Sequence, residues 1–189
     1  MTPRPPRFAA PSRTQLLAAI AAMGVVVLSS NILVQYAIND WLTWGAITYP
    51  FAFLVSELVN RSFGPQQARR VAWVGFAVAV AASLVLAPPR IALASGAAFI
   101  ASQWLDIGVF HRLRAGRWWR APLVATLLAA CLDTFLFWSI AFAGSAEPWM
   151  TWALGALGVK LVLGVALLLP FRLAIARWWK GPSAIASAK

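Results

Sequence analysis

The amino-acid sequence predicts an all-α membrane protein, a bundle of six transmembrane helices, and three observations lead to this prediction. Apolar residues make up 61% of the 189 residues, and the mean hydropathy is +0.76. Charged residues make up 11%, well below the roughly 25% that is usual in soluble domains. Apolar runs such as residues 16–36 and 123–142 reach the roughly 20 residues that a helix needs to cross a bilayer.

The first run follows several arginines, as a signal sequence would, but it is longer than a usual signal core, so we expect it to remain as a span. Segments with helix-breaking Gly and Pro or with charged residues separate the apolar runs, for example "RSFGPQQARR" and "RLRAGRWWRAP". A basic cytoplasmic tail over residues 1–13 and a short cytoplasmic tail over 179–189 would flank a single membrane domain over 14–178. The six expected spans are residues 14–36, 41–60, 69–87, 91–112, 122–143 and 150–171.

The second of these spans is expected to bend or break at Pro50. Proline has no backbone N–H, so Pro50 cannot donate to the carbonyl of Ala46. A broken helix is tolerated in a bilayer where it faces protein or a cavity. Two interpretations stay open, a kink that packing accommodates and a break that lines a site.

The positions of the cations predict the orientation of the bundle. Of the 16 Lys and Arg residues, 14 fall in the two tails, in the connection between the second and third spans, or in the connection between the fourth and fifth. The other connections carry Arg90 together with the acids Asp40 and Glu147. Because cytoplasmic connections are enriched in Lys and Arg, both termini are expected in the cytoplasm.

Ionisable side chains inside the spans are the main candidates for function. An ionised group in lipid costs about 2.5–3.5 kcal/mol on insertion scales, so such groups face the bundle interior or pair with one another. Asp133 and Lys160 each lie near the middle of a span and are expected to pair, either at a substrate site or as a structural ion pair. Glu57 has an alternative role, a surface ion pair with Arg61 four residues later.

A short pattern repeats in two spans. Residues 53–60 and 99–106 share F-x-x-S-[E/Q]-x-x-[N/D]. At helical spacing the polar members of each copy share one face, so two polar stripes are expected to enclose a common pocket. The stripes consist of Ser56, Glu57 and Asn60 in one copy and of Ser102, Gln103 and Asp106 in the other.

The sequence carries no enzyme signature, so we expect no enzyme, no cofactor and no metal site. It has one His and one Cys, too few for a His/Cys metal site. It contains neither a Walker loop nor a glycine-rich dinucleotide fingerprint, so nothing indicates use of ATP by this chain. The net charge of +11 lies in the connections and tails, so it indicates membrane topology rather than a nucleic-acid partner.

Four blocks of the sequence resemble the queuosine precursor transporter family, also called the vitamin uptake transporter family. They are "SNIL" (30–33), "GAITYPFAFLVSELVNRSFGPQQARRVAWVGF" (45–76), "SQWLDIGVFHRLR" (102–114) and "LDTFLFWSIAF" (132–142). Lys160 and Pro170 also look like a Lys and a Pro of the family's last span. The chain departs from the family at Ala129-Ala130, where a Ser-Gln pair is usual, and at Ser56, where Asp is frequent.

The resemblance implies an inner-membrane importer of 7-cyano-7-deazaguanine or 7-aminomethyl-7-deazaguanine, in the bacterial plasma membrane. It implies a six-helix bundle similar to the substrate-binding subunits of energy-coupling-factor transporters. The partners would be the deazapurine and the lipid bilayer, with no nucleic acid and a homodimer left open. The polar positions that it carries over as substrate-binding are Asn31, Glu57, Asn60, Gln103, Asp106, Asp133 and Lys160.

The chemistry of these side chains suits a deazaguanine. A carboxylate such as Glu57 or Asp106 can accept hydrogen bonds from the ring N–H and the exocyclic amine of the base. The side-chain amide of Gln103 or Asn60 can donate a hydrogen bond to its carbonyl. Aromatic faces can stack on the base, a contact of about 1–3 kcal/mol. Two other functions stay open: a binding subunit that needs a separate ATP-driven partner, and a membrane scaffold without transport. Transport itself could be facilitated or coupled to protons.

Overall fold

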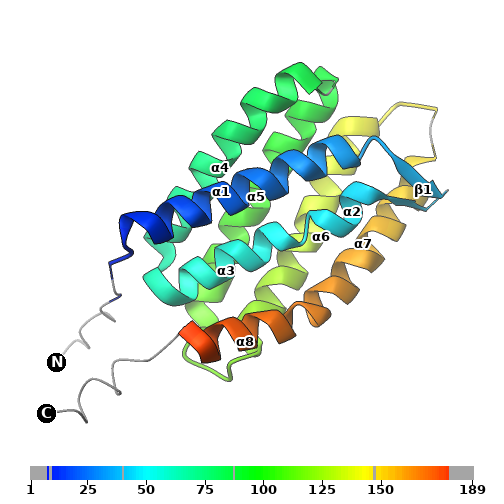
Figure 1. Ribbon diagram of the computed structural model, residues 1–189. Helices are drawn as coiled ribbons and strands as arrows, with labels where there is room; N and C mark the ends of the chain where they lie inside the picture. Colours follow the sequence, from blue (N-terminus) through cyan, green and yellow to red (C-terminus); the bar gives the residue numbers. More distant parts are fainter. Residues whose placement is uncertain (1–7, 9, 40, 87, 147, 179–189) are drawn as a thin grey trace, which may run out of the picture.

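The computed structural model describes residues 8, 10–39, 41–86, 88–146 and 148–178. Most of the expected tails, and the acids Asp40 and Glu147, therefore lie outside the described residues. The chain folds into a helical bundle with one small hairpin (Figure 1). The elements are α1 (Arg13–Leu33), β1 (Ala37–Asn39), β2 (Leu42–Thr43), α2 (Trp44–Thr48), α3 (Phe51–Phe63), α4 (Pro65–Leu86), α5 (Pro89–Leu113), α6 (Arg120–Phe142), α7 (Trp149–Ala166) and α8 (Leu168–Trp178).

The expectation of a helical, multi-pass membrane protein is confirmed. In the described chain, four stretches are long and apolar enough to cross a membrane. They are Arg13–Leu33, Pro89–Leu113, Arg120–Phe142 and Trp149–Ala176, the last of which joins α7 to most of α8. The other two expected spans correspond to α2 with α3, and to the 22-residue α4. The expectation of an all-helical chain needs one correction, because β1 and β2 pair antiparallel between α1 and α2.

The predicted interruption at Pro50 is present. Helix α2 ends at Thr48, and α3 begins at Phe51 with Pro50 as its N-cap residue. Tyr49 lies at the interruption, where its N–H donates to the carbonyl of Gly45 at 3.0 Å. The helix is therefore divided beside a buried tyrosine, which points into the bundle and not to its surface.

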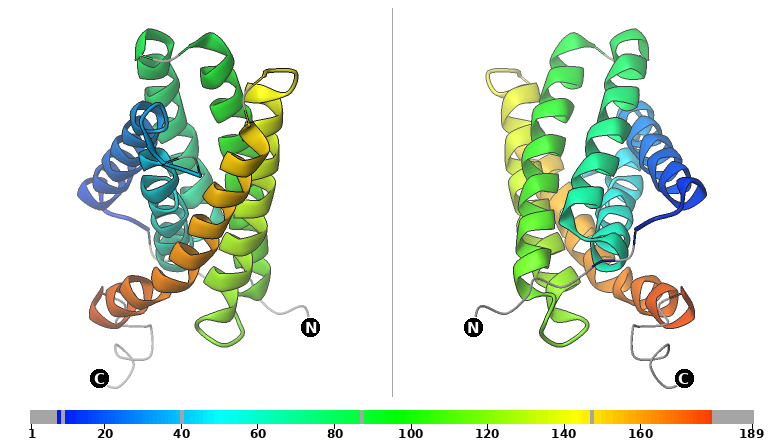
Figure 2. Two further views of the ribbon diagram at one scale, coloured as in Figure 1. Left: turned by 90° about the vertical axis from the view of Figure 1, so that its right-hand side faces the viewer. Right: turned by 90° about the vertical axis from the view of Figure 1, so that its left-hand side faces the viewer.

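The two ends of the bundle differ in their cations, as the sequence predicts. Figure 2 shows the α4–α5 and α6–α7 connections at one end, and the α5–α6 connection with α8 at the other. At the first end Arg90 donates to the carbonyls of Ile140 and Ala143 at 3.0 and 2.6 Å. At the second end Arg61 and Arg114 each donate to the other's backbone carbonyl. A left-handed glycine, Gly64 (φ +88°), makes the tight α3–α4 turn at this end.

Packing places α3, α5 and α6 around the polar interior. Helix α5 makes its most extensive contacts with α6, while α1 packs mainly on α4 and α7 on α6. A fully buried apolar cluster lies between α1, α3, α4 and α5, and it includes Met23, Phe53 and Phe99. Gly45 lets α2 approach α1, since a Cβ there would lie 2.7 Å from the Cα of Val34. The polar side chains described next are held between these packed faces.

Candidate functional site

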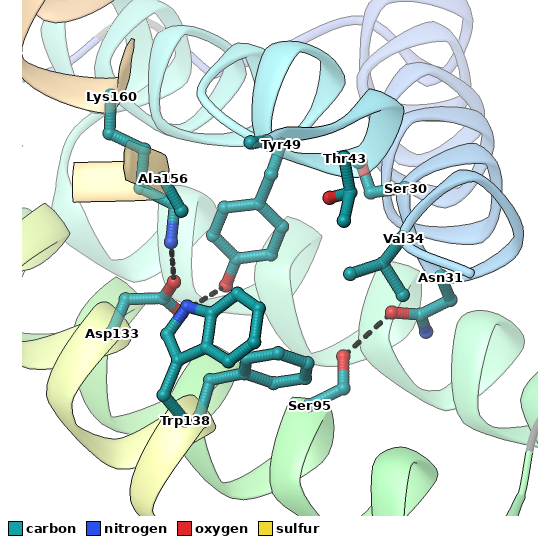
Figure 3. A pocket seen from close by; sticks show the side chains of 13 residues that line it. Ser30, Asn31, Val34, Thr43, Tyr49, Ser95, Asp133, Trp138, Ala156 and Lys160 are labelled. Atoms are coloured by element: carbon teal, nitrogen blue, oxygen red, sulfur yellow. Dashed lines mark hydrogen bonds and ion pairs between the residues drawn. The ribbon is translucent and has the colours of Figure 1, made fainter. Parts of the chain in front are cut away.

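A small cavity opens near the hairpin end of the bundle. It measures about 40 Å³, which is room for about two or three water molecules. Six elements contribute to its wall, among them α1, α6 and α7 (Figure 3). Its polar lining consists of Ser30, Asn31, Thr43, Tyr49, Ser95, Asp133, Trp138 and Lys160, and Val34, Gly45, Ala46, Phe137 and Ala156 complete it.

Asp133 makes more side-chain hydrogen bonds than any other residue of this wall that the structure describes. Its Oδ2 lies 2.6 Å from the Nζ of Lys160, and its Oδ1 accepts from the hydroxyl of Tyr49 at 2.7 Å. Ser102 donates to the same Oδ1 at 3.4 Å, and Lys160 also donates to the hydroxyl of Thr134. In Figure 3 the side chains of Lys160 and Tyr49 converge on Asp133 from two different helices. The predicted pairing of Asp133 with Lys160 is confirmed.

Asn31 occupies the opposite side of the cavity. Its amide donates to the hydroxyl of Ser83 at 2.7 Å, and its Oδ1 accepts from Ser95 at 2.6 Å. Ser30, one residue earlier, lies 2.9 Å from the hydroxyl of Thr48. The cavity therefore has an ion pair on one wall and neutral amides and hydroxyls on the other, with the aromatic rings of Tyr49 and Trp138 beside it.

A second polar group lies deeper, between α3, α5 and α6, and we call Ser56, Glu57, Asn60, Gln103, Asp106 and Thr126 the inner group. Thr126 donates to Glu57 Oε1 at 2.6 Å, Asn60 donates to the carbonyl of Ile107 at 3.0 Å, and Ser56 donates to Gln103 Oε1. Several polar atoms of the inner group have no hydrogen-bond partner among the described residues. They are Asn60 Oδ1, Gln103 Nε2 and both carboxyl oxygens of Asp106.

The seven residues expected to bind substrate are thus divided into two sets. Asn31, Asp133 and Lys160 line the cavity. Glu57, Asn60, Gln103 and Asp106 belong to the inner group, and the cavity reaches none of them. One cavity therefore does not join all seven residues, because its lining includes no member of the inner group.

The alternative role considered for Glu57, an ion pair with Arg61, is wrong. Glu57 is 4% exposed and turns toward Thr126 on α6. Arg61 turns instead toward the α5–α6 connection, where its Nη1 donates to the carbonyl of Arg114 at 2.9 Å. Arg114 in turn donates to the carbonyls of Asn60 and Arg61 at 3.1 and 2.9 Å. Partial burial, together with the like charge of Arg61, lowers the pKa of Arg114 from its ordinary value.

Sequence reasoning missed several lining residues, above all Tyr49. Its only sequence signal is its position beside Pro50, where a broken helix can direct a side chain into a site. Ser95 and Trp138 were also missed, because single serines and tryptophans in apolar helices are common. Sequence reasoning also did not predict that Thr126 is the partner of Glu57.

Comparison with known proteins identifies the family. A family model described as "Putative vitamin uptake transporter" matches residues 43–88 and 81–175. The "Queuosine precursor transporter" of Escherichia coli strain K12 is 36% identical over 177 residues, which covers 77% of this chain and 79% of that protein. The "Probable queuosine precursor transporter" of Haemophilus influenzae is 36% identical over 163 residues, covering 71% of this chain and 69% of the relative.

A more distant relative, the "Probable queuosine precursor transporter" of Bacillus subtilis, is 28% identical over 138 residues and covers 57% of this chain. No solved structure was found to match this chain at a significant level. The family match extends over most of the chain, from the end of the hairpin into α8. It includes the inner group and the cavity wall apart from Ser30, Asn31 and Val34. The chain therefore belongs to the vitamin uptake transporter family, whose members are transporters and not enzymes.

Proposed function

We propose that this chain imports a queuosine precursor, 7-cyano-7-deazaguanine or 7-aminomethyl-7-deazaguanine, across the bacterial inner membrane. The observation that carries the proposal is its 36% identity over 177 residues to the Escherichia coli protein named queuosine precursor transporter. The cavity adds support, since it combines amide, hydroxyl and aromatic groups that suit a purine-like base.

We further propose six spans with both termini in the cytoplasm. The 22 residues of α4 suffice for a crossing, and α2 with α3 supplies the remaining one as a broken helix. Six crossings would bring the end that carries Arg61 and Arg114 to the cytoplasm and the end that carries Arg90 to the opposite side. The cavity near the hairpin would then receive substrate from outside.

For the substrate site we propose the cavity wall. Asn31 can exchange its bonds with Ser83 and Ser95 for bonds to the base, and Tyr49 or Trp138 can stack on it. A base needs more room than the about 40 Å³ present, so binding requires these side chains or α2 to move. We assign the inner group to the route that the substrate follows from this cavity toward the cytoplasm.

The charge balance of the cavity favours the neutral 7-cyano compound. The charged groups of the wall are Asp133 and Lys160, and they neutralise each other at 2.6 Å. A 7-aminomethyl group would bring an unmatched positive charge beside Lys160. Burying an unmatched charge is costly, so the cationic precursor should bind more weakly.

The test is uptake of labelled 7-cyano-7-deazaguanine by purified protein in liposomes, with guanine and riboflavin as competitors. We expect uptake by the wild type, competition by deazaguanines and none by riboflavin. Asn31→Ala should weaken binding, whereas Ser145→Ala, outside the cavity, should not. Liposomes that take up no deazaguanine, although the folded protein shows a thermal shift with riboflavin, would contradict the proposal.

A second candidate is a binding subunit that depends on an ATP-driven partner. The exposure of Ala18, Ala21 and Ala22 on α1 favours it, because small exposed residues allow close docking of another helix. The same liposomes separate the two candidates. Binding without uptake by the purified chain, restored when a partner is present, would establish the second.

A further inference from the structure

The inner group contains two acids that no cation neutralises. Asp106 is 0% exposed and Glu57 is 4% exposed. Among the described residues the one ion pair is Lys160–Asp133, and neither carboxyl oxygen of Asp106 receives a hydrogen bond. Glu57 receives one hydrogen bond, from Thr126. The Ser56–Gln103 and Asn60–Ile107 hydrogen bonds hold the turn of α3 that carries Glu57 against the turn of α5 that carries Asp106.

The helices packed around Asp106 provide no compensating charge. Helix α3 carries Arg61, but its guanidinium is held at the carbonyl of Arg114. The arginines of α4 are exposed, and Arg69 lies over the ring of Trp104 at 5.2 Å. Besides Asp106, the described charged and titratable groups on α5 and on the helices packed against it are Arg90, His111 and Arg112 on α5, Glu57 and Arg61 on α3, Arg69 and Arg70 on α4, and Arg120, Cys131 and Asp133 on α6.

Two ionised carboxylates are unfavourable together while the site is closed to water. Burying one unpaired charge away from water is strongly unfavourable, and a second like charge beside it adds repulsion. One bound proton removes the repulsion and leaves a single buried charge. Buried ionisable residues in membrane proteins commonly serve as proton relays for this reason.

We propose that Glu57 and Asp106 together bind the proton that drives uptake, an inference that rests on the proposed transport function. A proton fits better than a metal ion, because it needs no added volume in a site where both side chains are buried and outside the cavity. The proton adds to one carboxylate oxygen from water on the outer side. It leaves that oxygen for cytoplasmic water after the substrate has passed, so one positive charge moves inward with each neutral base.

A short path joins this proton site to the proposed substrate site. Ser102 precedes Asp106 by one helical turn on α5, about 6 Å along the axis, and shares its face. The hydroxyl of Ser102 donates to Asp133 Oδ1 at 3.4 Å. A substrate that displaces Tyr49 from Asp133 would therefore alter the hydrogen bonds of Asp133. Asp133 contacts Ser102, which lies on the same face of α5 as Asp106.

The experiment measures accumulation of labelled 7-cyano-7-deazaguanine in proteoliposomes at several imposed pH differences, with a pH-sensitive dye inside. With one proton per substrate, each unit of pH difference supports about a tenfold accumulation. We expect that slope for the wild type, inward proton flux when substrate is added, and no response to a sodium gradient.

Asp106→Asn is the decisive variant. It should lose both the dependence on pH difference and the substrate-induced proton flux, yet keep counterflow exchange above that of empty liposomes. Glu57→Gln should reduce the slope in the same way. The matched control is Glu147→Gln, which removes an acid from the connection between α6 and α7 and should keep the wild-type slope.

The outcomes distinguish this inference from the proposed function. If the wild type neither binds nor exchanges a deazaguanine, the proposed function fails. If it shows net uptake of the base without proton flux, or responds to sodium instead, only the proton site is refuted. A pH-dependent slope that persists in Asp106→Asn and Glu57→Gln also refutes it. An infrared band of a protonated carboxyl that is present in the wild type and lost in Asp106→Asn supports it independently of transport.

Discussion

Asp133 and Asp106 lie on the neighbouring helices α6 and α5, both buried, but their surroundings are opposite. Asp133 receives hydrogen bonds from Tyr49 and Ser102 and pairs with Lys160. Asp106 receives none from the described residues. Hydrogen bonds to a carboxylate stabilise its charged form and hold it in place, and a carboxylate without such donors lacks that stabilisation. We therefore propose different roles for the two acids, Asp133 in shaping the cavity and Asp106 in carrying a proton.

The largest effect on stability is expected when the cation that pairs with Asp133 is removed. Lys160→Met leaves a buried carboxylate without its partner and is expected to lower the free energy of unfolding by about 3–5 kcal/mol. Chemical unfolding in detergent measures this. The double variant Asp133→Asn, Lys160→Met should regain much of the loss, and a single variant as stable as the wild type would show that the pair does not hold the helices.

The next test concerns the end of the inner group that lies beside the α5–α6 connection. Arg114→Gln removes two charged hydrogen bonds to the carbonyls that end α3, at Asn60 and Arg61, and should cost about 2–3 kcal/mol. The exposed Arg117→Gln is the control and should change stability by less than about 0.5 kcal/mol. Equal effects of the two substitutions, measured by thermal unfolding, would contradict a specific role for Arg114.

A smaller effect is expected from Tyr49→Phe. The substitution keeps the ring but removes the hydroxyl that donates to Asp133 at 2.7 Å, so about 1.5 kcal/mol should be lost. Tyr36→Phe, at an exposed tyrosine, provides the control. If both variants unfold at the same denaturant concentration as the wild type, the hydroxyl does not stabilise the cavity wall.

The smallest effect on stability is expected for Asp106→Asn, and it separates the two acids most clearly. Asp106→Asn removes no hydrogen bond to a described residue and keeps the shape of the side chain, so it should lower the free energy of unfolding far less than Asp133→Asn does. Asp133→Asn should be clearly less stable under the same conditions. A large loss of stability in Asp106→Asn would mean that this acid is structural after all.

Much of the helical architecture could be predicted from the sequence. Lipid admits only helices with apolar surfaces, so the long apolar runs predict α1, α5, α6 and α7 closely. The same cost of charge in lipid predicts that Asp133 and Lys160 meet, because neither can stay alone. The β1–β2 hairpin could not be predicted, since strands of three and two residues carry too little pattern.

The division of the polar side chains could not be predicted either. Ser102 and Asp106 lie one turn apart on the same face of α5, yet the first contacts Asp133 and the second contacts no donor. Which of two such positions meets a partner depends on how far α6 is shifted along α5, and a single sequence does not encode that shift in any local pattern. For the same reason the sequence suggested one hollow where the structure has a cavity and a separate inner group.

The interruption at Pro50 also has a mechanical meaning. A single stretch of chain carries Tyr49 to the cavity wall and Glu57 to the inner group, and the interruption between them lacks one backbone hydrogen bond. We propose that α2 moves with an arriving substrate while α3 stays packed on α5 and α6. In that proposal the interruption is a hinge, with the substrate on one side of it and the proton on the other.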